Sequence, residues 1–168
     1  HTLLKLCPNI ETYTIIDLTP MLKLSSGYLE KVLESEFLKL SFVSANAIHE
    51  WENIEADLAI NIDSFQEMPQ QTISNYIDKL FSKCKAVYIK NPVCKYSPEL
   101  LGIEGSRKHD VFSLGLMTEV ANIFNEYELN RMRTIYASKY LPSSKHKIVN
   151  SLASDLFAYY QHILYTSS

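Results

Sequence analysis

One short stretch of the sequence, residues 61–69 (NIDSFQEMP), holds an unusual number of hydrogen-bonding side chains. Asp63, Ser64, Gln66 and Glu67 lie between an apolar run and a proline that opens an amphipathic segment. A plain connection between a strand and a helix needs only a turn residue and a cap. The extra carboxylate and amide groups therefore predict a polar ligand, because they can bind hydroxyl groups or take a proton from one.

A second candidate is Asp17, which ends the apolar run at residues 12–17 (TYTIID). A carboxylate at the end of a buried strand can accept hydrogen bonds from both hydroxyls of a ribose, as in nucleotide-binding sheets. An equally weighted alternative is that Asp17 only helps to cap the following helix. The glycine-rich turn that accompanies such an acid lies about 20 residues earlier, so we expect it upstream of His1.

These groups need a scaffold, and the hydrophobic pattern predicts strands that alternate with helices. Apolar and β-branched runs predict strands at 12–17, 38–45, 56–62 and 85–91. Thr19-Pro20 predicts the N-cap and first position of a helix that Gly27 kinks or ends. Residues 69–81 have the apolar spacing of an amphipathic helix. Apolar strands between helices predict a parallel sheet with helices on both faces.

The signal is weaker after Asn91. Residues 92–110, which include His109, contain two prolines and two glycines and predict a long loop. Apolar spacing predicts helices at 114–127 and 149–163, with a strand between them at 133–142. We therefore expect a single domain over residues 1–168, whose C-terminal part is helical from about residue 111.

The predicted topology would bring the polar groups together. In an open parallel sheet, ligands bind beyond the carboxyl ends of the strands, where loops and helix N-termini meet. Asp17, Asn46, the 61–67 group and Asn91 all follow or end a predicted strand. One edge of the sheet is therefore the expected site.

Three stretches at this edge, 13–29 (YTIIDLTPMLKLSSGYL), 56–80 (ADLAINIDSFQEMPQQTISNYIDKL) and 86–91 (AVYIKN), resemble one family. They are similar to the sugar O-methyltransferases, a branch of the S-adenosylmethionine-dependent class I methyltransferases. That family has an acid-terminated strand, a helix with Tyr-Leu, an N-x-x-S-F-x-E-M-P motif and a strand ending in Asn. The match covers about the first ninety residues well, and SFQEMP is its most specific part.

The resemblance implies an α/β fold, a Rossmann-like class I methyltransferase sheet of seven strands with helices on both faces. Its first strand and glycine-rich loop would precede His1. The resemblance also implies S-adenosylmethionine as the cofactor and a sugar or glycan as the methyl acceptor. The implied cofactor contacts are Asp17, Leu18, Asn46 and Asn61, and the implied substrate contacts are Ser64, Gln66 and Asn91.

Methyl transfer to a hydroxyl is an in-line displacement, and a base that takes the hydroxyl proton accelerates it. Glu67 and Asp63 are the candidate catalytic carboxylates, with Glu67 slightly favoured. His49 and His109 are weaker imidazole candidates. A structural role for Glu67 has equal weight, because an acid near a helix N-terminus is stabilised by the helix dipole.

Composition argues against several other classes. Sixteen basic and nineteen acidic residues leave a net charge of -3, which gives no general attraction to nucleic acid or to an anionic membrane. Cys7, Cys84 and Cys94 form no CxxC pair, so we expect no metal site and a reducing cytoplasm. A non-catalytic binding module built on the same sheet is the alternative function. A nicotinamide-dependent oxidoreductase is less favoured.

Overall fold

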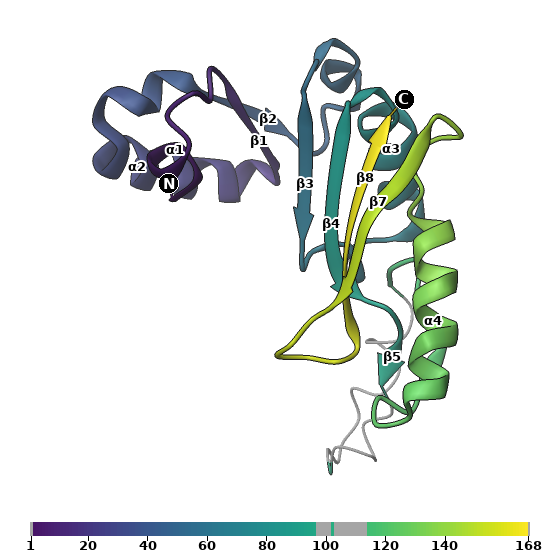
Figure 1. Ribbon diagram of the computed structural model, residues 1–168. Helices are drawn as coiled ribbons and strands as arrows, with labels where there is room; N and C mark the ends of the chain where they lie inside the picture. Colours follow the sequence, from purple (N-terminus) through teal and green to yellow (C-terminus); the bar gives the residue numbers. More distant parts are fainter. Residues whose placement is uncertain (1, 97–101, 103–113, 168) are drawn as a thin grey trace. The chain divides into compact units, whose positions relative to one another are not determined.

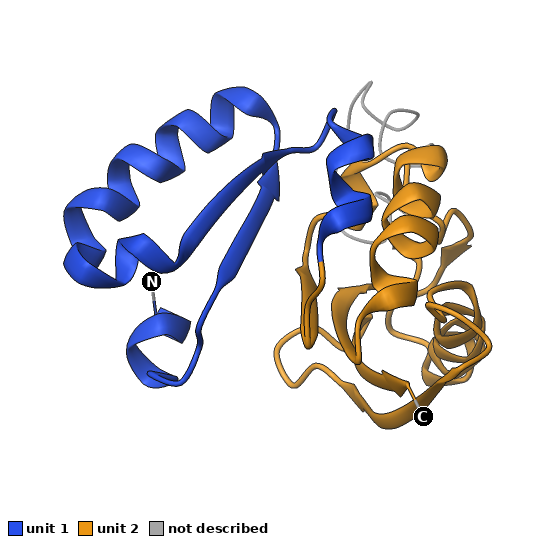
Figure 2. Ribbon diagram, turned by 90° about the horizontal axis from the view of Figure 1, so that it is seen from above, with its two compact units in different colours: residues 1–54 blue, residues 55–168 orange. Residues whose placement is uncertain are grey.

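The computed structural model of the chain describes residues 2–96, 102 and 114–167 (Figure 1). The chain divides into two compact units, His1–Ile54 and Glu55–Ser168, which are blue and orange in Figure 2. None of the helices within the described ranges has the length and apolar character needed to cross a lipid bilayer. The single domain predicted for residues 1–168 stays a prediction.

The first unit is built on a parallel β–α–β arrangement. Its elements are α1 (Thr2–Leu6), β1 (Tyr13–Asp17), α2 (Thr19–Leu33), η1 (Glu34–Lys39), β2 (Leu40–Ser44) and η2 (Ile48–Asn53). β1 and β2 pair in parallel, with Tyr13 opposite Leu40 and Asp17 opposite Ser44. Buried Leu4, Leu29 and Leu33 form the core of this unit. The strands predicted at 12–17 and 38–45 are confirmed.

Helix α2 confirms the helix predicted after Thr19-Pro20. It continues through Gly27 to Leu33, so no part of the helix ends at Gly27, and the predicted kink there stays a prediction. Buried leucines on both sides of the glycine, Leu22 and Leu29, hold the helix against the unit. A mid-helix glycine costs only about 1 kcal/mol relative to alanine, and burying one leucine offsets that by about 1.5 to 3 kcal/mol. The N-cap is Leu18 rather than Thr19.

The second unit contains a mixed four-stranded sheet in the order β3–β4–β8–β7 (Figure 1). β3 (Leu58–Ile62) and β4 (Ala86–Pro92) pair in parallel, which confirms the strands predicted at 56–62 and 85–91. β8 (Tyr160–Ser167) lies between β4 and β7 (His146–Ala153) and is antiparallel to both, so the prediction of a parallel sheet is wrong for these two strands. β5 (Lys95–Tyr96) and β6 (Val120–Ala121) form a separate short parallel pair.

Helices and aromatic rings form the core of the second unit. η3 (Phe65–Glu67), α3 (Gln70–Lys79) and η4 (Phe81–Lys83) connect β3 to β4, and α4 (Glu126–Lys139) precedes β7. Phe65 is fully buried and stacks on Tyr140, with the ring centroids 5.6 Å apart. The Phe65 ring also packs against Tyr76 and Phe81. The turn after β3 is therefore anchored in the core by its own phenylalanine.

The helical predictions for the second half of the chain are wrong. Residues 114–119 have no regular helix, and α4 begins only at Glu126 because Asn125 caps it by accepting from the backbone of Tyr127 and Glu128. The strand predicted at 133–142 lies mainly in α4. The helix predicted at 149–163 is instead most of β7, a connection and the start of β8, stabilised by pairing between strands. Residues 97–101 and 103–113, including His109, lie outside the described residues.

Three buried tyrosines predict a loss of stability at high pH. Burial raises the pKa of Tyr136, Tyr140 and Tyr165, and each is at most 1% exposed. A raised pKa in the folded state contributes stability that is complete below the unfolded pKa of about 10 and is lost as pH rises through the folded pKa. We expect the urea midpoint, followed by circular dichroism, to fall between about pH 9 and about pH 11.

The exposed phenol of Tyr127 supplies a control for this prediction, since it is 82% exposed. The Tyr127→Phe variant should show the same pH dependence as the wild type. Tyr165→Phe should show a weaker one, because it removes one of the buried phenols. A urea midpoint that stays constant over this pH range would contradict the prediction.

Candidate active site

A network of amide side chains fixes the turn that follows β3. Asn91, at 1% exposed, accepts through Oδ1 from the backbone N–H groups of Ser64 at 3.1 Å and Phe65 at 3.2 Å. Its Nδ2 donates to Asn61 Oδ1 at 2.9 Å, and Asn61 Nδ2 donates to Ser64 Oγ at 2.7 Å. The structure thus brings three predicted site residues together. Their bonds to one another shape the turn, and their contacts with cofactor or substrate stay predictions.

Asp63 occupies an unusual backbone conformation at the exposed tip of this turn. Its φ is 57°, in the left-handed region that few residues other than glycine adopt. Its backbone N–H donates to the Lys90 carbonyl at 2.8 Å. Its Oδ1 accepts from Gln66 Nε2 at 2.6 Å and from the Tyr160 hydroxyl at 2.6 Å. Side-chain bonds therefore hold both the carboxylate and the turn.

Tyr160 is a member of this cluster that the sequence pattern did not predict. The spacing predicted a tyrosine in the core of a helix, but Tyr160 opens β8 and is partly exposed. Its ring packs against Tyr159 and Phe157, with centroids 5.1 Å and 5.7 Å away, and Lys90 Nζ lies 5.9 Å from its centroid. Burial raises the pKa of Tyr160, and the carboxylate of Asp63 and the charge of Glu67 raise it further.

Glu67 and Gln66 complete the turn. Glu67 is exposed, and its carboxylate forms no hydrogen bond with the part of the chain that the structure describes. Gln66 Nε2 also donates to the Asp63 carbonyl at 2.9 Å, while its Oε1 is buried without a hydrogen-bond partner among the described residues. Asp63, Glu67 and Gln66 therefore form a compact polar surface beside Tyr160.

Lys95 lies behind this surface and was also not predicted. It is 6% exposed, and its Nζ donates to the Gln66 carbonyl at 3.4 Å. Burial lowers the pKa of this ammonium group. Lys95 belongs to β5, a strand in the region that the sequence predicted to be a loop. Its buried side chain supports the η3 turn.

The remaining predicted residues belong to the first unit. Asp17 Oδ1 accepts from the Leu18 backbone N–H at 2.7 Å, and no side chain caps α2. Asn46 is exposed, and its backbone N–H donates to Ser44 Oγ at 3.3 Å. His49 is exposed, with its Nε2 3.8 Å from the Glu50 carboxylate. The prediction that a further strand of the sheet precedes His1 stays a prediction.

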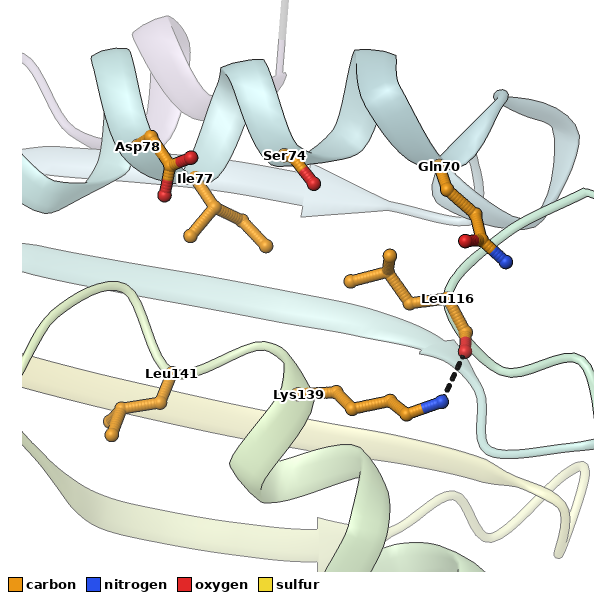
Figure 3. Close-up of a pocket in the computed structure, with 7 residues that line it drawn as sticks. All are labelled: Gln70, Ser74, Ile77, Asp78, Leu116, Lys139 and Leu141. Carbon is orange, nitrogen blue, oxygen red and sulfur yellow. Dashed lines mark hydrogen bonds between the residues drawn. The ribbon is translucent and has the colours of Figure 1, made fainter.

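A pocket of about 420 Å³ lies elsewhere in the second unit, beside α3 (Figure 3). Gln70, Ser74, Ile77 and Asp78 of α3 line one side, and Leu116, Lys139 and Leu141 line the other. Lys139 Nζ donates to the Leu116 carbonyl at 2.8 Å. Among the residues that the structure describes, no predicted site residue lines this pocket.

Solved structures resemble the chain, although no protein-family model and no curated protein matches its sequence. An O-methyltransferase family protein from Burkholderia thailandensis matches with a TM-score of 0.54 at 11% identity, over 94% of this chain and 44% of that one. The pyocyanin biosynthetic protein PhzM matches with a TM-score of 0.52 at 10% identity, over 98% and 45%. OxaC matches with a TM-score of 0.53 at 12% identity, over 99% and 39%.

These likenesses concern the fold, because identities of 10 to 12% carry no argument about substrate. The chain spans less than half the length of each of these three proteins. The fold class predicted from the sequence is confirmed: the chain has the α/β fold of class I methyltransferases.

Proposed function

We propose that this chain is part of an S-adenosylmethionine-dependent O-methyltransferase that methylates a hydroxyl of a sugar or glycan. One observation carries the proposal: the amide network at the carboxyl ends of β3 and β4 presents Asp63, Gln66 and Glu67 on an exposed surface. In an open α/β sheet this edge is where ligands bind. The class I methyltransferase fold supports the same reaction class.

Asp17 fits the ribose of the cofactor. It lies at the carboxyl end of β1, and only its Oδ1 is used by a described residue, the Leu18 N–H. Its Oδ2 thus remains available to accept hydrogen bonds from ribose hydroxyls. We assign Leu18, Asn46 and Asn61 to the cofactor as well. When bound, S-adenosylmethionine supplies a methyl group made electrophilic by its sulfonium charge.

The acceptor surface suits a polyhydroxylated ring. The carboxylates of Asp63 and Glu67 offer acceptors on one exposed turn, and the Gln66 amide, whose Nε2 donates to Asp63, holds the first of them in place. A sugar has several adjacent hydroxyl groups that such a surface can bind and orient. We assign Ser64, Gln66 and Asn91 to the substrate side, because all three shape the turn that presents Asp63 and Glu67.

The compartment proposed is the cytoplasm. Cys7, Cys84 and Cys94 are free thiols in the structure. Free cysteines are typical of reducing compartments, and sugar nucleotides and the methyl donor are small polar molecules that need no membrane contact.

The cofactor assignment predicts that Asp17→Ala weakens binding of S-adenosylmethionine by tenfold or more. A hydrogen bond to a charged group contributes about 1.5 to 3 kcal/mol, and the mutation removes those to the ribose. Isothermal titration calorimetry on the whole protein measures the affinity. Glu11→Ala is the matched control, since it removes an exposed acid before β1 and should bind as the wild type does. Equal affinity in the wild type and in Asp17→Ala would remove Asp17 from the site.

A further inference from the structure

Side-chain hydrogen bonds hold Asp63 in its left-handed conformation, which aspartate adopts more readily than most non-glycine residues. A non-glycine residue in the left-handed region costs about 1 kcal/mol or more, and it persists where the surroundings fix it. Two donors fix Asp63, because Gln66 and Tyr160 both donate to Oδ1 at 2.6 Å. Gln66 is a close neighbour in sequence, whereas Tyr160 comes from another strand, 97 residues away. The contact with Tyr160 therefore ties the β3 turn to β8.

The orientation of the Gln66 amide also indicates that the turn is arranged around Asp63. Its Nε2 faces two oxygen atoms of Asp63, so its Oε1 remains buried without a described donor. Leaving a buried acceptor unsatisfied costs about 1 to 3 kcal/mol. The turn tolerates this because the reversed amide would set an oxygen against two oxygens of Asp63. The local hydrogen bonding is thus arranged around the position of one carboxylate.

Resting on the function proposed above, we propose that Tyr160 is a positioning residue: its hydroxyl holds Asp63 so that Asp63 orients the acceptor while Glu67 takes the acceptor's proton. Asp63 Oδ1 is filled by the two donors, and Oδ2 forms no hydrogen bond with the described residues. Oδ2 is therefore the atom that accepts from a second acceptor hydroxyl. As the acceptor oxygen gains the methyl group and the carbon–sulfur bond breaks, the hydroxyl proton passes to the Glu67 carboxylate.

The raised pKa of Tyr160 supports this division of roles. Tyr160 stays protonated and remains a donor to Asp63, so it cannot serve as the base itself. Lys90 above the ring, and Tyr159 and Phe157 beside it, keep the phenol in place. Within the part of the chain that the structure describes, the charged groups that act on the phenol are Asp63, Glu67 and Lys90.

The test compares Tyr160→Phe with Tyr159→Phe in the whole protein. Tyr159 is the matched control: the substitution removes a neighbouring hydroxyl that bonds to no described residue. Methyl transfer from tritiated S-adenosylmethionine is measured with a panel of methyl glycosides and nucleotide sugars. We expect Tyr160→Phe to raise the acceptor KM about tenfold, with the acid limb of the pH profile unchanged, because an oriented contact is weakened while the base remains. Tyr159→Phe should behave as the wild type.

A second readout does not depend on activity. In protein labelled at tyrosine ¹³Cζ, the signal lost in Tyr160→Phe identifies Tyr160. This phenol should ionise above the ordinary value of about 10, and at a lower pH in Asp63→Asn. An unchanged Tyr160 titration in Asp63→Asn, or equal KM values in the wild type and Tyr160→Phe, would overturn the proposed role. A wild-type protein that neither binds S-adenosylmethionine nor transfers methyl groups would instead overturn the proposed function, whatever the tyrosine signals report.

Discussion

Glu67→Gln is expected to lower the turnover number by roughly 10² to 10⁴ while leaving the affinity for S-adenosylmethionine nearly unchanged. The amide keeps the shape of the side chain but cannot accept the acceptor's proton. The wild-type rate should fall at acid pH as the base becomes protonated, and this limb should disappear in the variant. Rates over a range of pH, with cofactor affinity measured by calorimetry, test the prediction.

Asp63→Asn is the matched comparison, because it makes the same chemical change in the neighbouring carboxylate. Since Asp63 orients the acceptor and does not take its proton in our proposal, its variant should mainly raise the acceptor KM and keep the acid limb. Full turnover with an unchanged pH profile in both variants would mean that this turn is polar for structural reasons. That outcome would favour a non-catalytic binding module on the same sheet.

Asn91→Ala should have the largest effect on stability. It removes the acceptor for the backbone N–H groups of Ser64 and Phe65 and the donor to Asn61. Each buried group left without a partner costs about 1 to 3 kcal/mol, so we expect a loss of about 3 kcal/mol or more in the free energy of unfolding. Urea denaturation at neutral pH, followed by circular dichroism, measures the loss.

Asn75→Ala is the control for the buried amide. Asn75 lies on α3, and its side chain accepts one long hydrogen bond from the described residues, that of Gln71 at 3.4 Å. Its substitution should change the free energy of unfolding by no more than about 0.5 kcal/mol. Similar losses in the two variants would show that the Asn91 network does not hold the β3 turn.

The first half of the fold could be predicted because its residues follow strong local rules. Val87 and Ile89 are fully buried in a strand with no charged residue on that face, and Ile73, Tyr76 and Ile77 fill one face of α3. Such patterns depend on near neighbours in sequence. The meeting of Asn61, Ser64 and Asn91 could also be predicted, because adjacent parallel strands end at the same edge of a sheet.

The predictions for the second half of the chain failed because contacts between residues far apart in sequence determine its structure. Leu152 and Leu156 have helical spacing but are 59% and 80% exposed, so their spacing reflects no buried face. β8 has Gln161 among its buried positions, which hides its alternation. Gly115 has a φ of 84° and lies against Gln66, where a Cβ would come within 3.3 Å of Cα. That contact requires a turn where the pattern predicted a helix.

The residues missed at the site share one property: distance in sequence from the turn that they support. Tyr160 and Lys95 contact Asp63 and Gln66 across 97 and 29 residues. No local pattern marks a tyrosine that opens a strand or a lysine in a short strand after a proline. The only available sign of a strand was the run YQHILYT, which follows Tyr159 and is rich in aromatic and branched residues.

The order of the strands in the sheet also determines when the sheet can form during synthesis. β7 pairs only with β8, and β8 joins it to β4, although β8 is the last of the three to be synthesised. β7 and β8 are close in sequence, but the pairing of β4 with β8, which sets Ala86 opposite Thr166, forms slowly because a long loop must close first. Until the ribosome has released β8, β4 has an unpaired edge on one side, and such edges are prone to aggregate. A nascent chain halted before β8 would therefore lack both the complete four-stranded sheet and the tyrosine that holds Asp63.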